Sequence, residues 1–176
     1  MPRHRSMSPQ PVLLGLLVSQ PRHGYELYQE LTCELGQVWH IGLSQLYAQL
    51  KQMEEAGWVS VEVEPQPNRP ARKVYHLTSE GRTHFSDWVH RPTPYLRFLR
   101  IEFLARLYFF QRLRLPGLDQ LVAEQKAVCL ARADTFARLS AKADSDFRRL
   151  VLEFREGQME AAIRWLDRCL ELLGPD

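Results

Sequence analysis

The chain has 176 residues and a formal net charge of +2, because 23 lysines and arginines nearly balance 21 aspartates and glutamates. Its 45% apolar and 25% charged residues are typical of an ordinary globular protein that can bury a core. Residues 1–91 contain nine basic and nine acidic side chains, and residues 92–176 contain fourteen and twelve. This balance excludes a histone-like binder, so any nucleic-acid contact must depend on a few well-placed cations.

The cysteine content and the hydropathy of the chain indicate the cellular compartment in which the protein is expected. Cys33, Cys129 and Cys169 are scattered and form no CxxC pair, which favours free thiols in a reducing cytosol. No apolar stretch approaches the ~20 residues that are needed to cross a bilayer. The apolar run Val12–Val18 follows basic residues but is short and lacks the small-x-small cleavage site of a signal peptide. We therefore expect a cytoplasmic protein with no membrane partner.

The first part of the chain predicts two helices. Pro11–Ser19 is short and almost wholly apolar, as expected of a central core element. Pro21–Gly24 is predicted to be a turn, and Tyr25–Leu35 is predicted to be the second helix. Its buried face is indicated by leucines spaced by four, namely Leu27, Leu31 and Leu35.

The stretch Gly42–Val59 predicts a third, amphipathic helix. Leu46, Leu50 and Met53 follow the i, i+4, i+7 spacing of a buried stripe. Gly57 is placed to end this helix. The opposite face of the helix should therefore point away from the core.

A ribbon of two strands is expected next. Trp58–Glu64 alternates apolar and polar residues, which predicts a half-buried strand. Pro65–Pro70 cannot be a central strand and is predicted to be a loop, and Lys73–Leu77 is the return strand. Thr78 is a plausible N-cap for a fourth helix that runs to about His90. This order of elements outlines a winged helix-turn-helix.

Two prolines within Arg91–Pro94 give the best domain boundary. We therefore predict a winged helix-turn-helix domain over residues 1–91 and an all-α domain over residues 92–176. The expected fold class is mainly α with a small two-stranded β wing.

The C-terminal half predicts helices over about 96–110, from 118 onward and over about 145–173. The last of these has two adjacent apolar seams, which is wider than one neighbouring helix covers. This width suggests packing against a second subunit as well as within the chain. The residues expected to serve dimerisation are Leu96, Leu99, Phe103, Phe154, Ile163, Trp165, Leu166, Leu170 and Leu173.

The outer face of the third helix has the properties of a DNA-reading surface. It is polar and carries no acid until Glu54 and Glu55 at the far end. Glutamine can donate to and accept from an adenine edge, so Gln45 and Gln49 are the best base-reading candidates. A solvated helix face is the simpler alternative. The candidate DNA-contacting residues on this face are Ser44, Gln45, Gln49 and Gln52.

The tip of the ribbon gathers positive charge. Asn68, Arg69, Arg72 and Lys73 fall within six residues, and no acid lies between Pro65 and Thr78. Cations at a hairpin tip can simply aid solubility. Beside a candidate recognition helix, however, they predict contacts with phosphate or with the minor groove.

Three further side chains are candidates for phosphate contact. Tyr47 and Lys51 stand four residues apart on the third helix. Tyr25, at the start of the second helix, can combine its hydroxyl with free backbone N–H groups to hold a phosphate. Either tyrosine could equally be part of the core.

Other chemistries find little support in the residues. All six histidines lie in the first half, and none pairs with another His or with Cys at a metal-ligand spacing. The stretch Gly42–Leu46 begins like a nucleophile elbow but lacks its second glycine and its preceding strand. There is no glycine-rich phosphate loop. We expect no enzyme, no metal and no cofactor; the remaining rival is a winged-helix module that binds protein instead of DNA.

The chain resembles the PadR-type transcriptional regulators. The match begins at Leu13–Leu17 (LLGLL) and His23–Leu27 (HGYEL). It continues through Leu46–Gly57 (LYAQLKQMEEAG) and ends with Arg72–Gly81 (RKVYHLTSEG). Order and spacing agree over about Val12–Trp88.

The C-terminal half resembles the longer subclass of this family, in which a helical domain mediates dimerisation. Arg100–Phe103 (RIEF) and Trp165–Asp167 (WLD) support this weaker match. The resemblance implies a homodimer that binds double-stranded DNA at a pseudo-palindromic operator, often as a repressor released by a small-molecule effector. Ala48 departs from the proline that usually follows the recognition-helix tyrosine, so fine DNA geometry does not transfer. Phenolic-acid sensing is not implied, because effectors vary widely in the family.

Overall fold

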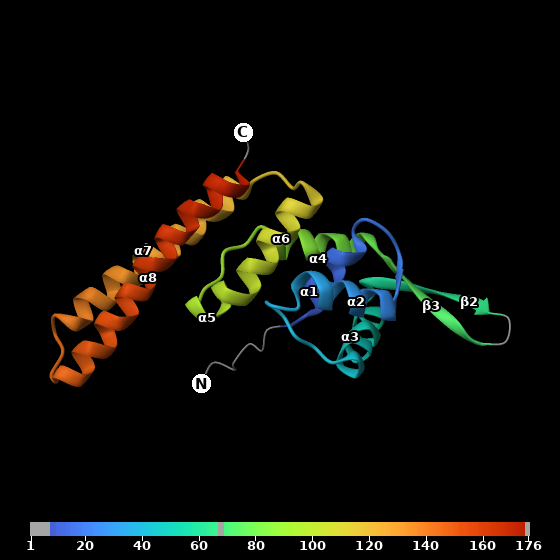
Figure 1. Cartoon of the computed structure of the whole chain (residues 1–176), viewed down its shortest axis with the longest axis horizontal. Helices are drawn as coiled ribbons and strands as arrows, with labels where there is room; N and C mark the ends of the chain where they lie inside the picture. The colour runs from blue at the N-terminus through green and yellow to red at the C-terminus, as the bar shows by residue number, and fades with distance from the viewer. Residues whose placement is uncertain (1–7, 67–68, 175–176) are drawn as a thin grey trace. The chain divides into compact units, whose positions relative to one another are not determined.

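The computed structural model describes residues 8–66 and 69–174 (Figure 1). The chain divides into two compact units. The first, which we call the head, comprises Met1–Val89 together with Leu104–Leu113, and the second comprises His90–Phe103 together with Arg114–Asp176. The second unit, called the helical unit below, is described separately from the head. The assignment of DNA binding to residues 1–91 and dimerisation to residues 92–176 stays a prediction.

The centre of the head is α1 (Gln10–Leu17), in which every residue after Gln10 is buried. This helix is apolar all round because it lies inside the head instead of at its surface. It contacts α2 (Gly24–Leu35), α3 (Leu43–Glu55) and α4 (Ser79–Val89). The three helices that precede the wing thus agree with the predicted ranges to within one or two residues.

The wing is part of a three-stranded antiparallel sheet with the order β1-β3-β2. Strand β2 (Val59–Gln66) pairs with β3 (Arg69–Leu77), and Val59 lies opposite Leu77 and Val63 opposite Lys73. Strand β1 (Arg22–His23) pairs with the base of β3. The prediction of a plain turn at Pro21–Gly24 was wrong in this respect, because two residues are too short to show a period-2 pattern.

The predicted loop Pro65–Pro70 was too long. Strand β2 continues to Gln66 and β3 begins at Arg69. Among the described strands, β2 pairs with β3 alone, and the register shifts between Glu64 and Gln66. A proline is tolerated at an edge strand or at a bulge, which explains why Pro65 does not end the strand.

The junction of wing and α4 depends on Thr78 and Gly81. The Thr78 hydroxyl donates to the Gly57 carbonyl over 2.7 Å and accepts from the Gly81 N–H over 3.1 Å, as an N-cap does. A Cβ at position 81 would lie 2.1 Å from the Trp58 carbonyl oxygen. Only glycine lets α4 approach the strand backbone this closely.

The head also contains α6 (Leu104–Leu113), which the sequence did not place there. Phe109 of α6 is fully buried and makes edge contacts with Phe85 and Trp88 of α4. The Arg106 Nε donates to the Trp88 carbonyl over 3.0 Å, and its guanidinium lies over the Trp88 ring. Aromatic packing and a buried arginine therefore attach α6 to α4.

The helical unit contains α5 (Leu96–Phe98), the π-helical turn η1 (Leu99–Phe103), α7 (Leu118–Ser140) and α8 (Asp146–Leu173). Helices α7 and α8 pack along each other. The Ser145 hydroxyl caps α8 by accepting from the Arg148 N–H. The single helix expected over about 96–110 is interrupted by η1, and only α5 and η1 belong to the helical unit.

The predicted dimerisation residues differ in exposure. Leu99, Phe103 and Leu166 are buried within one chain, so we withdraw them from the predicted interface. Phe103 contacts the Trp165 ring, which explains its burial. Phe154 is 67% exposed. The others are partly exposed: Leu96, Ile163, Trp165, Leu170 and Leu173.

Within the described residues, no helix has both the length and the apolar character that crossing a membrane requires.

Gly15 should be required by the packing of the head. A Cβ there would lie 2.5 Å from the Phe109 ring and 2.6 Å from the Phe85 ring. Overpacking costs about 1–3 kcal/mol and a helical Gly→Ala change recovers at most about 1 kcal/mol. We expect Gly15→Ala to lower the free energy of unfolding in urea by about 1–2 kcal/mol.

The matched control is Gly157→Ala in α8, where a Cβ would meet nothing within 4 Å. This change should leave stability unaltered or raise it by up to about 1 kcal/mol. A Gly15→Ala protein as stable as the wild type would contradict the packing described for α1.

Candidate nucleic-acid interface

The orientation of α3 is determined by its apolar stripe. Leu46, Leu50 and Met53 are all completely buried. The opposite face consequently points outward. Of the predicted reading residues, Gln49 is partly exposed and three are exposed, namely Ser44, Gln45 and Gln52. The Gln52 amide oxygen accepts a hydrogen bond from the Gln10 side chain over 3.1 Å.

One groove of about 840 Å³ lies between α2, α3 and the wing. It brings together five of the predicted contact residues, whose positions in the sequence span almost fifty residues: Tyr25, Tyr47, Lys51, Arg72 and Lys73. Helix α3 contributes Tyr47, Lys51 and Glu54 to the groove, whereas Ser44, Gln45, Gln49 and Gln52 are not among the described residues that line it.

The two tyrosines are surface residues. Tyr25 is 55% exposed and Tyr47 is 44% exposed, so neither belongs to the core. The Tyr47 ring lies on Gly24, where a Cβ would be 2.6 Å from the nearest ring carbon. Gly24, in the His23-Gly24-Tyr25 motif, thus leaves the space that the Tyr47 ring occupies. The ring packs on the Gly24 backbone and remains partly exposed.

The N-terminus of α2 already has a carboxylate beside it. The His23 N–H donates to Glu26 Oε2 over 2.9 Å. His23 Nδ1 lies 3.3 Å from the Lys73 carbonyl oxygen, and Nε2 lies 3.7 Å from Glu64. The predicted phosphate site at Tyr25 therefore has a negative charge next to it, and this end of the helix is less receptive to anions than expected.

The cations around the groove have acidic neighbours. Lys73 Nζ lies 3.7 Å from Glu54, and Lys51 Nζ lies 3.8 Å from Glu55 one turn away. All four side chains are well exposed, so these ion pairs are weak and readily exchanged for another anion. Arg72 is also exposed.

Tyr75 forms the floor of the groove where β3 enters the core. It is only 3% exposed. Burial raises the pKa of the Tyr75 hydroxyl, and the nearby Glu54 and Tyr47 raise it further. Tyr75 therefore stays neutral, and the charge available to a ligand comes from the lysines and Arg72.

Some predicted contacts cannot be placed in the groove. Asn68 lies outside the described residues, and the side chain of Arg69 is likewise not described although its backbone begins β3. Their roles stay predictions. His23, Glu54 and Ala71 line the groove but were not predicted to be site residues. The HGY motif was the available signal for His23, whereas Glu54 and Ala71 became neighbours of the site only through folding.

Within the parts of the chain that the structure describes, no group of three or more His, Cys, Asp and Glu side chains could hold a metal ion.

Comparison with known proteins gives matches over both units. The family model for PadR-like transcriptional regulators matches residues 13–87. A second model, described as the C-terminal part of virulence activator alpha, matches residues 99–174. The two matches fall on either side of the predicted boundary.

Curated relatives match over nearly the whole chain. The negative transcriptional regulator PadR of Bacillus subtilis is 27% identical over 175 residues, which cover 93% of this chain and 96% of the relative. A probable transcriptional regulator of Mycobacterium tuberculosis is 28% identical over 179 residues and covers 92% of this chain and 95% of its own length.

Among solved structures, that of Bacillus subtilis PadR in complex with operator DNA is similar to this chain. It has 25% sequence identity and a TM-score of 0.50, and the match covers 93% of this chain and 98% of that one. Together with the HGYEL and LYAQL motifs at the groove, these findings show that residues 13–87 match the PadR-like family of transcriptional regulators and that similarity to PadR regulators extends over nearly the whole chain.

Proposed function

We propose that the chain is a homodimeric transcriptional repressor that binds a pseudo-palindromic operator in the cytoplasm. The observation that supports this most is the groove at which Tyr47 and Lys51 of α3 meet the cations of the wing. The similar Bacillus subtilis protein is named a negative regulator, and its structure was solved with operator DNA. A two-fold dimer would present its heads to half-sites about one helical turn, ~34 Å, apart or a multiple of this.

In this proposal α3 and the wing have different tasks. Helix α3 enters the major groove, where Gln45 and Gln49 read base edges and Ser44 assists. Lys51, Arg72 and Lys73 bind phosphates, and the hydroxyls of Tyr25 and Tyr47 add neutral contacts. When DNA binds, phosphate replaces Glu54 and Glu55 as the partner of the lysines. Affinity then comes mainly from the wing and specificity from α3.

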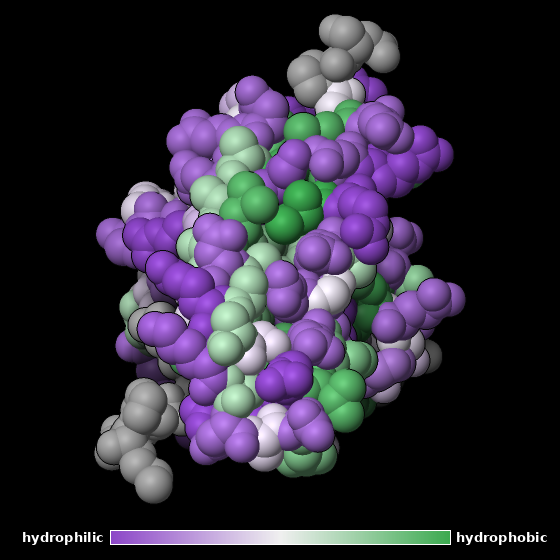
Figure 2. Space-filling view, turned by 90° about the vertical axis from the view of Figure 1, so that its left-hand side faces the viewer, coloured by the Kyte–Doolittle hydropathy of each residue, from purple (hydrophilic) through white to green (hydrophobic). Residues whose placement is uncertain are grey.

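The proposed dimer uses a strip of α8 that its own chain leaves uncovered. Helix α8 turns Leu152, Met159 and Leu166 inward, where they are buried. A strip on another face of the same helix carries large apolar side chains that are 64–78% exposed: Phe147, Leu150, Phe154 and Leu172. In the view from the side of α7 and α8, green apolar side chains emerge between purple polar ones (Figure 2). Burial of such a strip against a second copy would stabilise a dimer.

Release by a small molecule, which the family resemblance implies, fits the same scheme. An effector would lower operator occupancy by binding more tightly to a dimer state in which the heads do not fit the half-sites.

A protein-binding module is the rival proposal, and a salt titration separates the two. The Arg72→Ala dimer loses one cation in each head, and each phosphate contact contributes a slope of about 0.9. We expect its affinity for all DNA sequences to fall. The slope of log affinity against log salt should decrease by about 2 relative to the wild type.

Arg82→Ala is the matched control, because Arg82 is exposed on α4 and does not line the groove. It should keep the wild-type slope. Equal slopes for Arg72→Ala and Arg82→Ala would argue against the wing as the phosphate-binding element, and salt-independent binding would favour the rival.

Base reading makes a separate prediction. Gln45→Ala should weaken the free energy of operator binding by about 1–3 kcal/mol for each head, with little change in binding to random DNA. The ratio of operator affinity to random-sequence affinity should therefore fall. Competition assays on the DNA upstream of the protein's own gene measure this ratio. Gln111→Ala, an exposed glutamine of α6, should leave the ratio unchanged. Equal weakening on all sequences would show that Gln45 does not read bases.

The dimer strip is tested by Phe154→Glu. Phe154 is 67% exposed in one chain, so the change should leave the fold of the chain intact. A carboxylate at the centre of an apolar interface should shift sedimentation equilibrium at micromolar protein from the mass of two chains to that of one. Glu153→Ala, which alters the adjacent exposed residue, should remain dimeric. A wild-type protein that sediments as a monomer would contradict the proposed dimer.

A further inference from the structure

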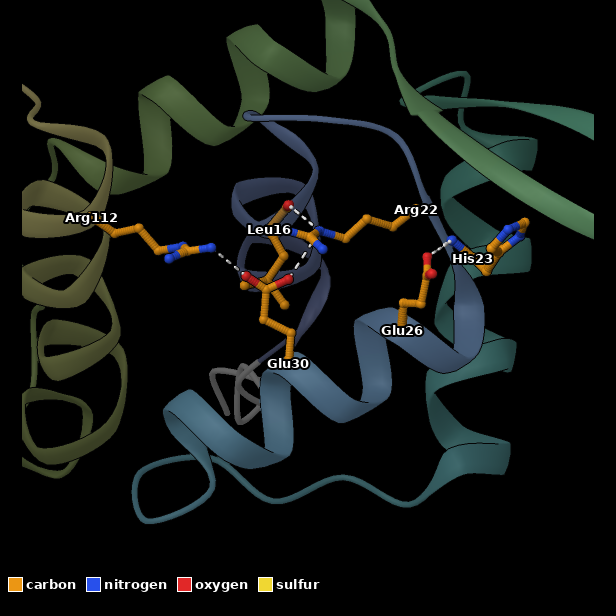
Figure 3. Close-up of polar contacts among 6 residues, drawn as sticks. All are labelled: Leu16, Arg22, His23, Glu26, Glu30 and Arg112. Atoms are coloured by element: carbon orange, nitrogen blue, oxygen red, sulfur yellow. Dashed lines mark hydrogen bonds and ion pairs between the residues drawn. The ribbon is translucent and has the colours of Figure 1, made fainter.

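Glu30 of α2 is a charged side chain inside the head that the proposed DNA contacts do not use. Its side chain is only 12% exposed. Glu30 Oε2 lies 2.9 Å from Arg22 Nε, and Oε1 accepts a hydrogen bond from Arg112 Nη2 over 2.8 Å (Figure 3). One buried carboxylate therefore holds two guanidinium groups that come from opposite sides of α2.

The first of these arginines belongs to the base of the wing. Arg22 is 16% exposed, and its Nε also lies 3.4 Å from the Leu16 carbonyl oxygen of α1. In β1, Arg22 pairs with Tyr75 and His23 pairs with Val74 of β3. The position of Arg22 thus sets where β1 meets the wing.

Arg22 directly precedes two groove-lining residues in the sequence. The next residues, His23 and Gly24, line the groove, and Gly24 supports the Tyr47 ring. Glu30, Arg22 and Arg112 themselves are not among the described residues that line it. Any effect of Glu30 on DNA must therefore act through β1 and the residues that follow it.

The second arginine comes from α6. Arg112 lies in the last turn of this helix and is 42% exposed at its side chain. Because Arg22 and Arg112 share one carboxylate, removal of that charge would leave two cations near each other, and the Arg22 side chain is only 16% exposed. The cost of unpaired buried charge is large compared with that of an exposed ion pair.

We propose that Glu30 is a positioning residue for DNA binding, which holds β1 through Arg22 and ties α6 to the same point through Arg112. The wing and the α2 N-terminus keep the orientation in which Lys73, Arg72 and Tyr47 share the groove. This inference rests on the proposed function, but its structural half can be measured without DNA.

The DNA-free measurement is amide hydrogen exchange of the full chain. In Glu30→Gln, which retains the shape of the side chain and removes its charge, we expect faster exchange at Val74 and Tyr75 and unchanged exchange in α4. Glu34→Gln is the matched control, because Glu34 is an exposed acid one turn later on the same helix. It should exchange like the wild type.

The DNA measurement is a salt titration of operator binding. A displaced wing makes fewer phosphate contacts, so Glu30→Gln should reduce the salt slope although no groove cation has been removed. Its affinity should fall about 2- to 30-fold, the range expected for coupling through a packed network. Loss of folded protein alone would lower the active fraction and leave the slope unchanged. Glu30→Asp, which keeps the charge, should recover part of the slope.

Arg112→Gln is a milder second variant, useful if Glu30→Gln folds poorly. It should weaken operator binding in the wild-type background and have no further effect when combined with Glu30→Gln. The proposal is overturned if Glu30→Gln matches Glu34→Gln in both exchange and salt slope, or if the two substitutions act additively. A wild-type protein that does not bind DNA, with exchange in Glu30→Gln altered as expected, would instead overturn the proposed function.

Discussion

The burial of one stripe of α3 is the constraint on which the rest of the structure depends. Leu46, Leu50 and Met53 are all completely buried, so the helix cannot rotate without exposing them. Each of these side chains contributes about 1.5–3 kcal/mol on burial, which outweighs any preference of the polar face. The face that carries Gln45 is thereby turned outward. The wing holds its cations beside Tyr47 and Lys51, on another side of the same helix.

The cations of the groove are few and have acidic neighbours, which has consequences for binding. Glu54 and Glu55 lie within 4 Å of Lys73 and Lys51, so DNA must displace a carboxylate from each lysine before phosphate can take its place. A single head should then bind weakly, and two heads on one DNA raise affinity through their high effective concentration. If the proposed dimer forms through the exposed strip of α8, this strip is in that sense part of the binding mechanism.

Sequence patterns predicted those elements whose signal is local. The two long apolar seams located α8, and the alternation of apolar and polar residues located β2. The groove was only half predicted, because Glu54 meets Lys73 through the fold and not through spacing.

The missed features share a physical reason. An apolar stripe shows that a face of a helix is buried, but it does not show which element covers that face. Phe103 and Phe154 looked alike in sequence, yet one is fully buried and the other is 67% exposed. Helix α6 has a composition like that of the helices beside it in the sequence. Phe109 of α6 packs against Gly15 of α1, and this contact places α6 in the head. Strand β1 has two residues and becomes visible only through its pairing with β3.

The central claim is that the α3 face and the wing lie directly on DNA, and site-specific photocrosslinking tests it most directly. A photoreactive side chain is placed in turn at Gln45, Arg72 and Arg82 of the full-length protein bound to its upstream DNA. We expect crosslinks from position 45 to bases in two symmetric half-sites, crosslinks from position 72 to the flanking backbone, and none from position 82. Crosslinks from position 82 with none from position 45 would contradict this claim.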